Sequence, residues 1–270
     1  MNLAVTPIPP KPHNGFTLVE LSVVLVIIGL LIGGVMLGKD LIRASEISSI
    51  ISDKEKFSAA VYSFQTKYNA LPGDMRDAQT YWGGAASCTT AQTTLATCNG
   101  DGDGFILKGY GSGTIGNEIF LFWKHLANAE LIPGKYTGIT DGTKTYSTTK
   151  TNAPSGKIDG SLWYAETFGT KSGDPWSFDG DYGTMLEFGS PWANEDPWRP
   201  ILTAKEMWAL DSKIDDGKPG TGSLMVTMAG TNCTAKTNGV TTSTPSDSQT
   251  AVYRTTSTGN ICALRFTNLF

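Results

Sequence analysis

One run of apolar residues constrains the fold of this chain more than any other feature. The 23 residues from position 16 to position 38 contain a single charged side chain, that of Glu20. As an α-helix this run would be about 34 Å long, enough to cross the roughly 30 Å hydrocarbon core of a bilayer. The sequence therefore predicts a helix that can span a membrane.

Residues 1–15 predict a leader segment. They are mostly polar and include four prolines, which prevent a helix. The run that follows is longer than the stretch of about 7 to 15 apolar residues in a secretory signal peptide. A plain membrane anchor fits the length but leaves the carboxylate of Glu20 unexplained. Cleavage between Gly15 and Phe16 would create an α-amino group four residues ahead of Glu20. The two charges would then neutralise each other, within one subunit or between neighbours.

The hexapeptide Gly15-Phe16-Thr17-Leu18-Val19-Glu20, with the apolar run after it, resembles the type III signal of type IV pilins and type II secretion pseudopilins. In that family a prepilin peptidase in the inner membrane cuts after the glycine and methylates the new first residue. The resemblance therefore implies cleavage after Gly15 and methylation of Phe16. It also implies that Glu20 pairs with the amine of an adjacent subunit during filament assembly.

The same resemblance implies a structural subunit and not an enzyme. The expected product is a subunit of a type IV pilus or of a secretion or DNA-uptake pseudopilus. The precursor is expected in a bacterial inner membrane with its head in the periplasm, and the mature subunit in a filament at the cell surface or outside the cell. Expected partners are prepilin peptidase, other copies or related pilins, and the inner-membrane assembly machinery. The alternative is a membrane-anchored surface adhesin or receptor that never polymerises.

The helix is expected to continue beyond the membrane segment. Apolar residues recur at spacings of three and four from Ile47 to Tyr68, which is typical of an amphipathic helix. Pro72 and Gly73 then stop it. The sequence thus predicts a stem helix over residues 16–68, of which 16–38 form the transmembrane or filament-core part. This layout resembles the stem and globular head of pilins.

Residues 69–270 are expected to form one globular head with a mixed α+β fold. Helices are predicted over 117–131 and 204–213, and Thr203 and Glu206 have the spacing of a capping box at the start of the second. A small antiparallel sheet is predicted from short strand candidates. These candidates are residues 161–168, 185–188, 224–228, 251–254 and 261–266.

The four cysteines form two local pairs in the sequence. An even count in an exported domain favours disulfides, and the local pairing is Cys88 with Cys98 and Cys233 with Cys262. Four cysteines permit three connectivities. Loops of this size would contribute about 3 kcal/mol each to stability.

A calcium site is predicted in the loop that starts at Asn99. Asn99, Asp101 and Asp103 alternate with glycines, as oxygen ligands do in the first two thirds of an EF-hand loop. The twelfth position is Tyr110 instead of the bidentate glutamate, so that ligand must come from elsewhere. The competing interpretation is a turn rich in Asx residues.

A second calcium site or a salt-bridged junction is predicted where the helix at 204–213 ends. Asp211, Asp215 and Asp216 place three carboxylates at the negative end of the helix dipole, which is unfavourable without a cation. The segment also resembles an end-of-helix signature of pseudopilin-like sequences, some of whose heads bind calcium. A solvated turn is the alternative.

Two further patterns bear on function. Trp176, Trp192 and Trp198 each follow a proline and form a candidate platform for sugars or a partner surface, although such residues also fill small cores. The net charge of −4 disfavours nucleic acid as the main partner. His125 has no partners with catalytic or metal-binding spacing and is expected to be a packed or surface side chain.

Overall fold

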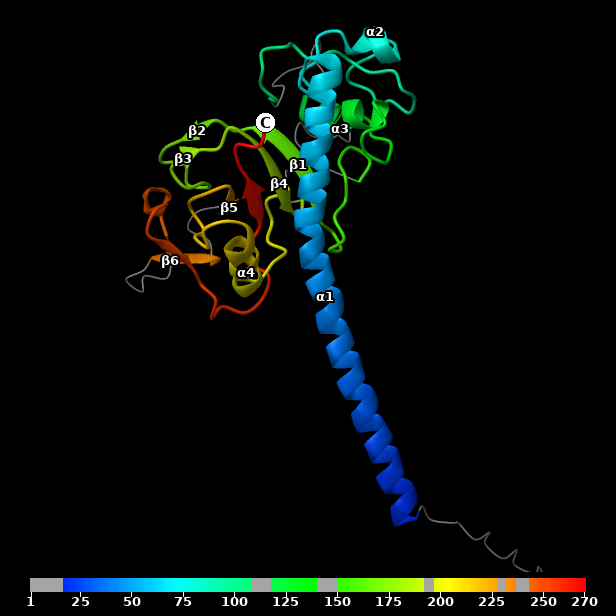
Figure 1. The fold of residues 1–270 in the computed structure, drawn as a ribbon, viewed down its shortest axis with the longest axis vertical. Helices are drawn as coiled ribbons and strands as arrows, with labels where there is room; N and C mark the ends of the chain where they lie inside the picture. Colours follow the sequence, from blue (N-terminus) through cyan, green and yellow to red (C-terminus); the bar gives the residue numbers. More distant parts are fainter. Residues whose placement is uncertain (1–16, 108–117, 140–149, 192–196, 228–231, 237–242) are drawn as a thin grey trace, which may run out of the picture. The chain divides into compact units, whose positions relative to one another are not determined.

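The computed structural model describes residues 17–107, 118–139, 150–191, 197–227, 232–236 and 243–270 (Figure 1). The chain divides into two compact units, residues 1–45 and residues 46–270. A long N-terminal helix, an antiparallel sheet and further helices form the α+β layout that the sequence predicts, and that prediction is confirmed.

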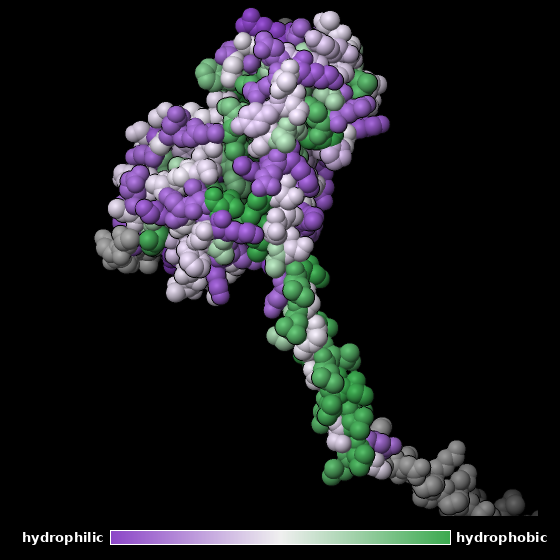
Figure 2. Space-filling model, viewed as in Figure 1, coloured by the Kyte–Doolittle hydropathy of each residue, from purple (hydrophilic) through white to green (hydrophobic). Residues whose placement is uncertain are grey.

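Helix α1 (Leu18–Tyr68) begins in the first unit and ends in the second. Its N-terminal part, residues 18–42, exposes large apolar side chains, with Leu18 at 85% and Leu30 at 73% exposure. Figure 2 shows this part of the helix as a largely hydrophobic surface. Within the described part of the chain, α1 is the one helix long and apolar enough to cross a membrane.

The C-terminal part of α1 contributes the predicted apolar stripe to the core of the second unit. Ile50, Phe57, Val61 and Phe64 are buried. The Phe57 ring lies 5.1 Å from the ring of Trp123 and 5.4 Å from that of Trp163, in edge-to-face geometry that favours aromatic pairs. Phe57 therefore joins α1 to a second helix and to the sheet.

The main sheet has four antiparallel strands in the order β1-β4-β8-β5. Strand β8 is paired on both sides and so lies in the interior of the sheet. The four strands match four of the strand candidates of the sequence. Their bounds are β1 (Leu162–Thr167), β4 (Thr184–Gly189), β5 (Leu224–Val226) and β8 (Leu264–Phe266).

Side chains alternate between the two faces of this sheet, and both faces are buried. One face, which includes Trp163, Leu186 and Phe266, belongs to the main core that α1 covers. The other carries Glu187 and Arg265, which are directly opposite each other on β4 and β8. Because both faces are covered, the charged pair on the second face is removed from water.

Two short two-stranded ribbons accompany the main sheet. Strands β2 (Thr170–Lys171) and β3 (Gly180–Asp181) form one, and strands β6 (Thr234–Lys236) and β7 (Ala251–Tyr253) form the other. Of these four strands, the sequence predicted β7 alone. A 3₁₀ turn, η1 (Pro245–Asp247), lies between β6 and β7 in the chain.

Three further helices lie in the described part of the second unit. Helices α3 (Glu118–Asn128) and α4 (Ala204–Ile214) agree with the two predicted helices to within a few residues. The predicted capping box is confirmed, because Thr203 Oγ1 accepts from Glu206 N and Glu206 Oε2 accepts from Thr203 N. The five-residue helix α2 (Ala78–Trp82) was not predicted.

The turn after α1 is fixed against α3. Gly73 has φ +92°, and a Cβ atom there would lie 2.5 Å from the carbonyl oxygen of Glu118, so glycine is required at this position. Two disulfides close loops elsewhere in the same unit, Cys88 with Cys98 and Cys233 with Cys262. This is the local pairing that the sequence favours.

His125 on α3 is fully buried, and both of its ring nitrogens are hydrogen bonded. Nδ1 accepts from Gly73 N at 3.0 Å, and Nε2 lies 3.2 Å from the carbonyl oxygen of Cys98. The ring also stacks on Phe64 and Trp82. Burial lowers the pKa of His125 to about 3, so the folded protein holds the neutral ring.

This histidine is expected to make the folded head sensitive to acid. Its pKa is lower in the folded state than its ordinary value of 6.5, so its contribution is complete above pH 6.5 and falls as the pH drops towards 3. At pH 4.5 the loss is about 3 kcal/mol. Urea unfolding at pH 7 and pH 4.5 measures it. The variant His125→Asn retains an acceptor for Gly73 N but has no group that titrates in this range. Its loss of unfolding free energy between pH 7 and pH 4.5 should be smaller than that of the wild type by this amount. An equal loss in both proteins would contradict the assignment.

Candidate functional site

The N-terminus of α1 holds the first candidate site, around Glu20. Thr17 and Glu20 form a capping box: Glu20 N donates to Thr17 Oγ1 at 3.2 Å, and Thr17 N donates to Glu20 Oε2 at 2.8 Å. The hydroxyl of Thr17 also donates to Glu20 Oε2. The Thr-x-x-Glu spacing could have revealed this cap in the sequence. Gly15 and Phe16, the predicted cleavage and methylation positions, lie outside the described residues.

Glu20 is the one acidic side chain in an otherwise apolar stretch of helix surface. Thr17 satisfies part of the hydrogen-bonding capacity of its carboxylate, and an ionised carboxylate has about four acceptor positions. Capacity therefore remains for a cationic donor. The geometry permits both a capping role and the predicted pairing with an amine.

A second candidate site is a group of three carboxylates that the sequence predicted only in part. One carboxylate oxygen from each of Asp74, Asp101 and Glu118 lies within 4.8 Å of the other two. Asp74 comes from the turn after α1, Asp101 from the glycine-rich loop, and Glu118 from the first turn of α3. These are hard oxygen donors of the kind that calcium prefers.

Burial raises the pKa values of two members of this group, which is called the first acidic cluster below. The side chains of Asp74 and Glu118 are 4% and 3% exposed. Desolvation raises the pKa of Glu118 to about 7 and also raises that of Asp74, and nearby acidic groups add to both effects. Backbone N–H groups partly compensate: Asp101 N and Leu107 N donate to Glu118, and Gly104 N donates to Asp74. A bound cation would favour the ionised forms.

The other two predicted ligands of the glycine-rich loop have local hydrogen bonds. Asn99 Oδ1 accepts from Gln79 N at 2.9 Å, near the N-terminus of α2. Asp103 Oδ1 accepts from Phe105 N at 2.8 Å, as in an Asx turn. Of the predicted set, Asp101 is the residue that the structure brings together with other carboxylates. Asp74 and Glu118 were missed because no spacing rule links positions so far apart in the chain.

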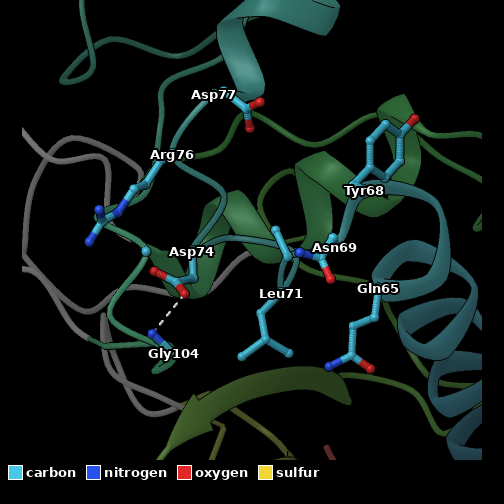
Figure 3. Close-up of a pocket in the computed structure, with 10 residues that line it drawn as sticks. Gln65, Tyr68, Asn69, Leu71, Asp74, Arg76, Asp77 and Gly104 are labelled. Atoms are coloured by element: carbon cyan, nitrogen blue, oxygen red, sulfur yellow. Dashed lines mark hydrogen bonds between the residues drawn. The ribbon is translucent and has the colours of Figure 1, made fainter.

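The first acidic cluster lies beside a cavity of about 690 Å³ (Figure 3). Figure 3 shows Asp74 and Arg76 on one side of it, Gln65 and Asn69 on the other, and Leu71 between them. Arg76 Nε donates to the carbonyl oxygen of Asp101 at 2.5 Å. This hydrogen bond links the turn after α1 to the glycine-rich loop. The cavity therefore has polar walls formed by the end of α1 and the two loop segments.

The third candidate site is the predicted acidic group at the end of α4. Carboxylate oxygens of Asp211, Asp215 and Asp216 lie within 4.8 Å of one another, so the structure brings all three residues together. Asp211 is fully buried and accepts from the Tyr253 hydroxyl at 2.6 Å. Its pKa is raised to about 7, mainly by burial and also by the two neighbouring carboxylates. These three residues are called the second acidic cluster below.

Two of the three tryptophans of the predicted platform, Trp176 and Trp198, lie in the described part of the chain. Trp176 is 57% exposed, and its ring centroid lies 6.3 Å from that of Trp198. Trp192 lies outside the described residues. Trp198 is half-buried, so the pair presents one exposed ring and is a small surface feature.

Comparison with known proteins gives one match. Residues 10–36 match the family model described as the prokaryotic N-terminal methylation motif, which is the signal of type IV pilins and pseudopilins. No curated protein and no solved structure matches the chain. The motif includes Gly15, Phe16 and Glu20, so it supports the N-terminal site and carries no information on the head. The signal implies processing by prepilin peptidase, and with the apolar helix it fits membrane anchoring of a precursor.

Proposed function

We propose that this chain is a pilin-like structural subunit that is assembled into a type IV pilus or a type II secretion-type pseudopilus. The observation that carries the proposal is an N-terminal methylation motif placed on an exposed apolar helix whose first turn holds Glu20. Burying that surface is strongly favourable, because apolar area contributes about 25 cal/mol per Å². The precursor buries it in a bilayer, and the mature subunit buries it against the equivalent helices of its neighbours.

The proposal assigns each N-terminal residue a distinct role. Prepilin peptidase cuts the peptide bond between Gly15 and Phe16 and transfers a methyl group to the new amine of Phe16. Glu20 then accepts a charge-assisted hydrogen bond from the Phe16 amine of a neighbouring subunit, which is stronger than a neutral hydrogen bond in apolar surroundings. The inner-membrane assembly machinery extracts the subunit, and the head faces the periplasm before assembly. Nothing in this scheme requires catalysis by the chain itself.

Intact-mass analysis tests the processing step directly. We expect protein purified from a host that has prepilin peptidase to begin at Phe16 and to carry one added methyl group. The same chain from a host without the peptidase should begin at Met1. A mature protein that starts at Met1 in the presence of the peptidase would contradict the proposal and would favour the non-polymerising adhesin instead.

We also propose that calcium stabilises the head. Support comes from the grouping of three carboxylates in each acidic cluster. Burial raises the pKa values of Glu118 and Asp211, and the neighbouring carboxylates add to this. A ligand at a hundredfold excess over its Kd stabilises the folded state by about 2.7 kcal/mol. That corresponds to a rise in melting temperature of about 5 °C or more for a unit of this size.

Thermal melts in calcium and in excess chelator test this proposal and separate the ligand sets. Asp211→Asn should abolish the response of the second cluster. In the first cluster, Glu118→Gln should reduce the calcium response if Asp74, Asp101 and Glu118 are the ligands, whereas Asp103→Asn should reduce it if the glycine-rich loop binds the ion as in an EF-hand. An identical melt of the wild type with and without calcium would remove both sites.

A further inference from the structure

Lys124 on α3 is a buried cation that takes no part in the proposed assembly. Lys124 is only 2% exposed, although lysine side chains are almost never fully buried without a partner. The ammonium group donates to the carbonyl oxygens of Thr94 at 2.9 Å and Tyr136 at 3.3 Å. An ammonium group has three donors, so these two bonds leave one donor for another acceptor.

No carboxylate among the described residues pairs with Lys124. Its hydrogen-bond partners there are neutral carbonyl oxygens, and none of the ion pairs in the described part of the chain includes it. Burial lowers its pKa to about 8, and no anion among the described residues opposes this shift. A buried charge is costly unless it is paired as well as hydrogen bonded. The structure therefore holds a positive charge whose counter-ion is missing from the described residues.

A cavity of about 280 Å³ adjoins this charge. Three ionisable side chains besides Lys124 line it, Glu130, Lys135 and Tyr136. Glu130 and Lys135 are exposed, so water screens them more than it screens Lys124. Burial raises the pKa of Tyr136 to about 12, so its phenol is neutral. Polar groups of Gln92 and Thr94 from one loop, and of Asn128 at the end of α3, complete the lining. The cavity is close to the lower limit of size for ligand pockets, which restricts it to a small molecule or a single terminal group.

We propose that this cavity is a binding site for a small oxyanion, a carboxylate or a phosphate, which Lys124 holds through its remaining donor. The hydroxyl groups of Thr93 and Thr94 and the remaining amide hydrogen of Asn128 would bind the other oxygens of the anion. The anion would supply the missing counter-charge and would bridge α3 to the loops of residues 92–95 and 133–136. The site is separate from Glu20 and from both acidic clusters, so it does not depend on filament assembly.

Thermal melts of the full-length chain in a mild detergent, followed by tryptophan fluorescence, test the proposal. The probes are inorganic phosphate and acetate, each compared with chloride at the same ionic strength and with chelator present throughout. We expect one or both probes to raise the melting temperature of the wild type by about 3 °C or more above chloride. A response to phosphate alone identifies the site with phosphate ligands, and a response to acetate identifies it with carboxylates.

Two matched variants make the result specific. Phosphate stabilises many proteins by exclusion from their surface, so the criterion is the difference between the wild type and Lys124→Met. Lys135→Met removes an exposed lysine from the same cavity and should keep the response. Equal responses of the wild type and Lys124→Met would overturn the proposal. A third variant, Asp141→Asn, removes a carboxylate in the stretch 140–149, which lies outside the described residues. If this variant responds to the probes and the wild type does not, the counter-ion of Lys124 belongs to the chain itself, and the proposal is overturned.

Discussion

Replacing Glu20 with glutamine is expected to stop filament assembly while cleavage after Gly15 continues. Glutamine can occupy the last position of a capping box, so the variant keeps the cap with Thr17 and loses the charge. If the carboxylate pairs with the amine of a neighbour, its loss leaves that ammonium group uncompensated among apolar helices. The expected yield of filaments falls by about tenfold or more.

Electron microscopy of sheared filaments, with immunoblots of the membrane fraction, measures this effect. Thr17→Ala is the matched control because it breaks the cap and retains the charge, and it should assemble better than Glu20→Gln. Intact mass confirms that both variants are cut and methylated. Normal filaments from Glu20→Gln would refute the pairing role and leave capping as the function of Glu20.

Replacing Arg265 with methionine is expected to give the largest loss of stability in the head. Arg265 Nε donates to Glu187 Oε2 at 3.0 Å, and the two residues are 5% and 2% exposed. The guanidinium also donates to Ser177 Oγ and lies 4.6 Å from the centre of the Phe168 ring. Removing the guanidinium leaves the buried carboxylate of Glu187 without a cation, which lowers the free energy of unfolding by about 3 to 5 kcal/mol.

Chemical denaturation at pH 7 measures this loss, and a double variant tests its cause. Glu187→Leu with Arg265→Met removes both charges together, and replacing a whole buried pair with apolar side chains is often neutral. The double variant should therefore be more stable than Arg265→Met alone. If both variants lose the same free energy of unfolding, the cause is lost packing against Phe168 and not the unpaired charge.

The sequence predicted the elements that depend on local patterns. The spacing of apolar residues gave α1, α3 and α4, and capping chemistry placed the start of α4 at Ala204 because Thr203 and Glu206 are close in the chain. Four strands of the main sheet were long or apolar enough to be recognised. Strands β2, β3 and β6 were missed, since two or three residues rich in threonine, glycine and lysine have no distinct period.

Features that join distant parts of the chain could not be predicted in this way. Asp74 and Glu118 are 44 positions apart, and Glu187 and Arg265 are 78 apart, so only the tertiary fold brings each pair together. The second acidic cluster was recognisable because its three residues lie within one helix end and its turn. The burial of Lys124 was missed for a related reason. Its position on α3 does not reveal that two loops, at residues 92–95 and 133–136, cover its side chain.

The order of the main sheet also has a consequence for when the head can fold. Strand β8, which contains Arg265, follows β1, β4 and β5 in the chain, yet in the sheet it lies between β4 and β5. Strand β4 can pair with β1 earlier, but β5 joins the sheet only through β8, and that pairing must close a long stretch of chain. The complete sheet, and with it the buried pair of Glu187 and Arg265, should therefore form late in folding, only after the chain is available as far as residue 266.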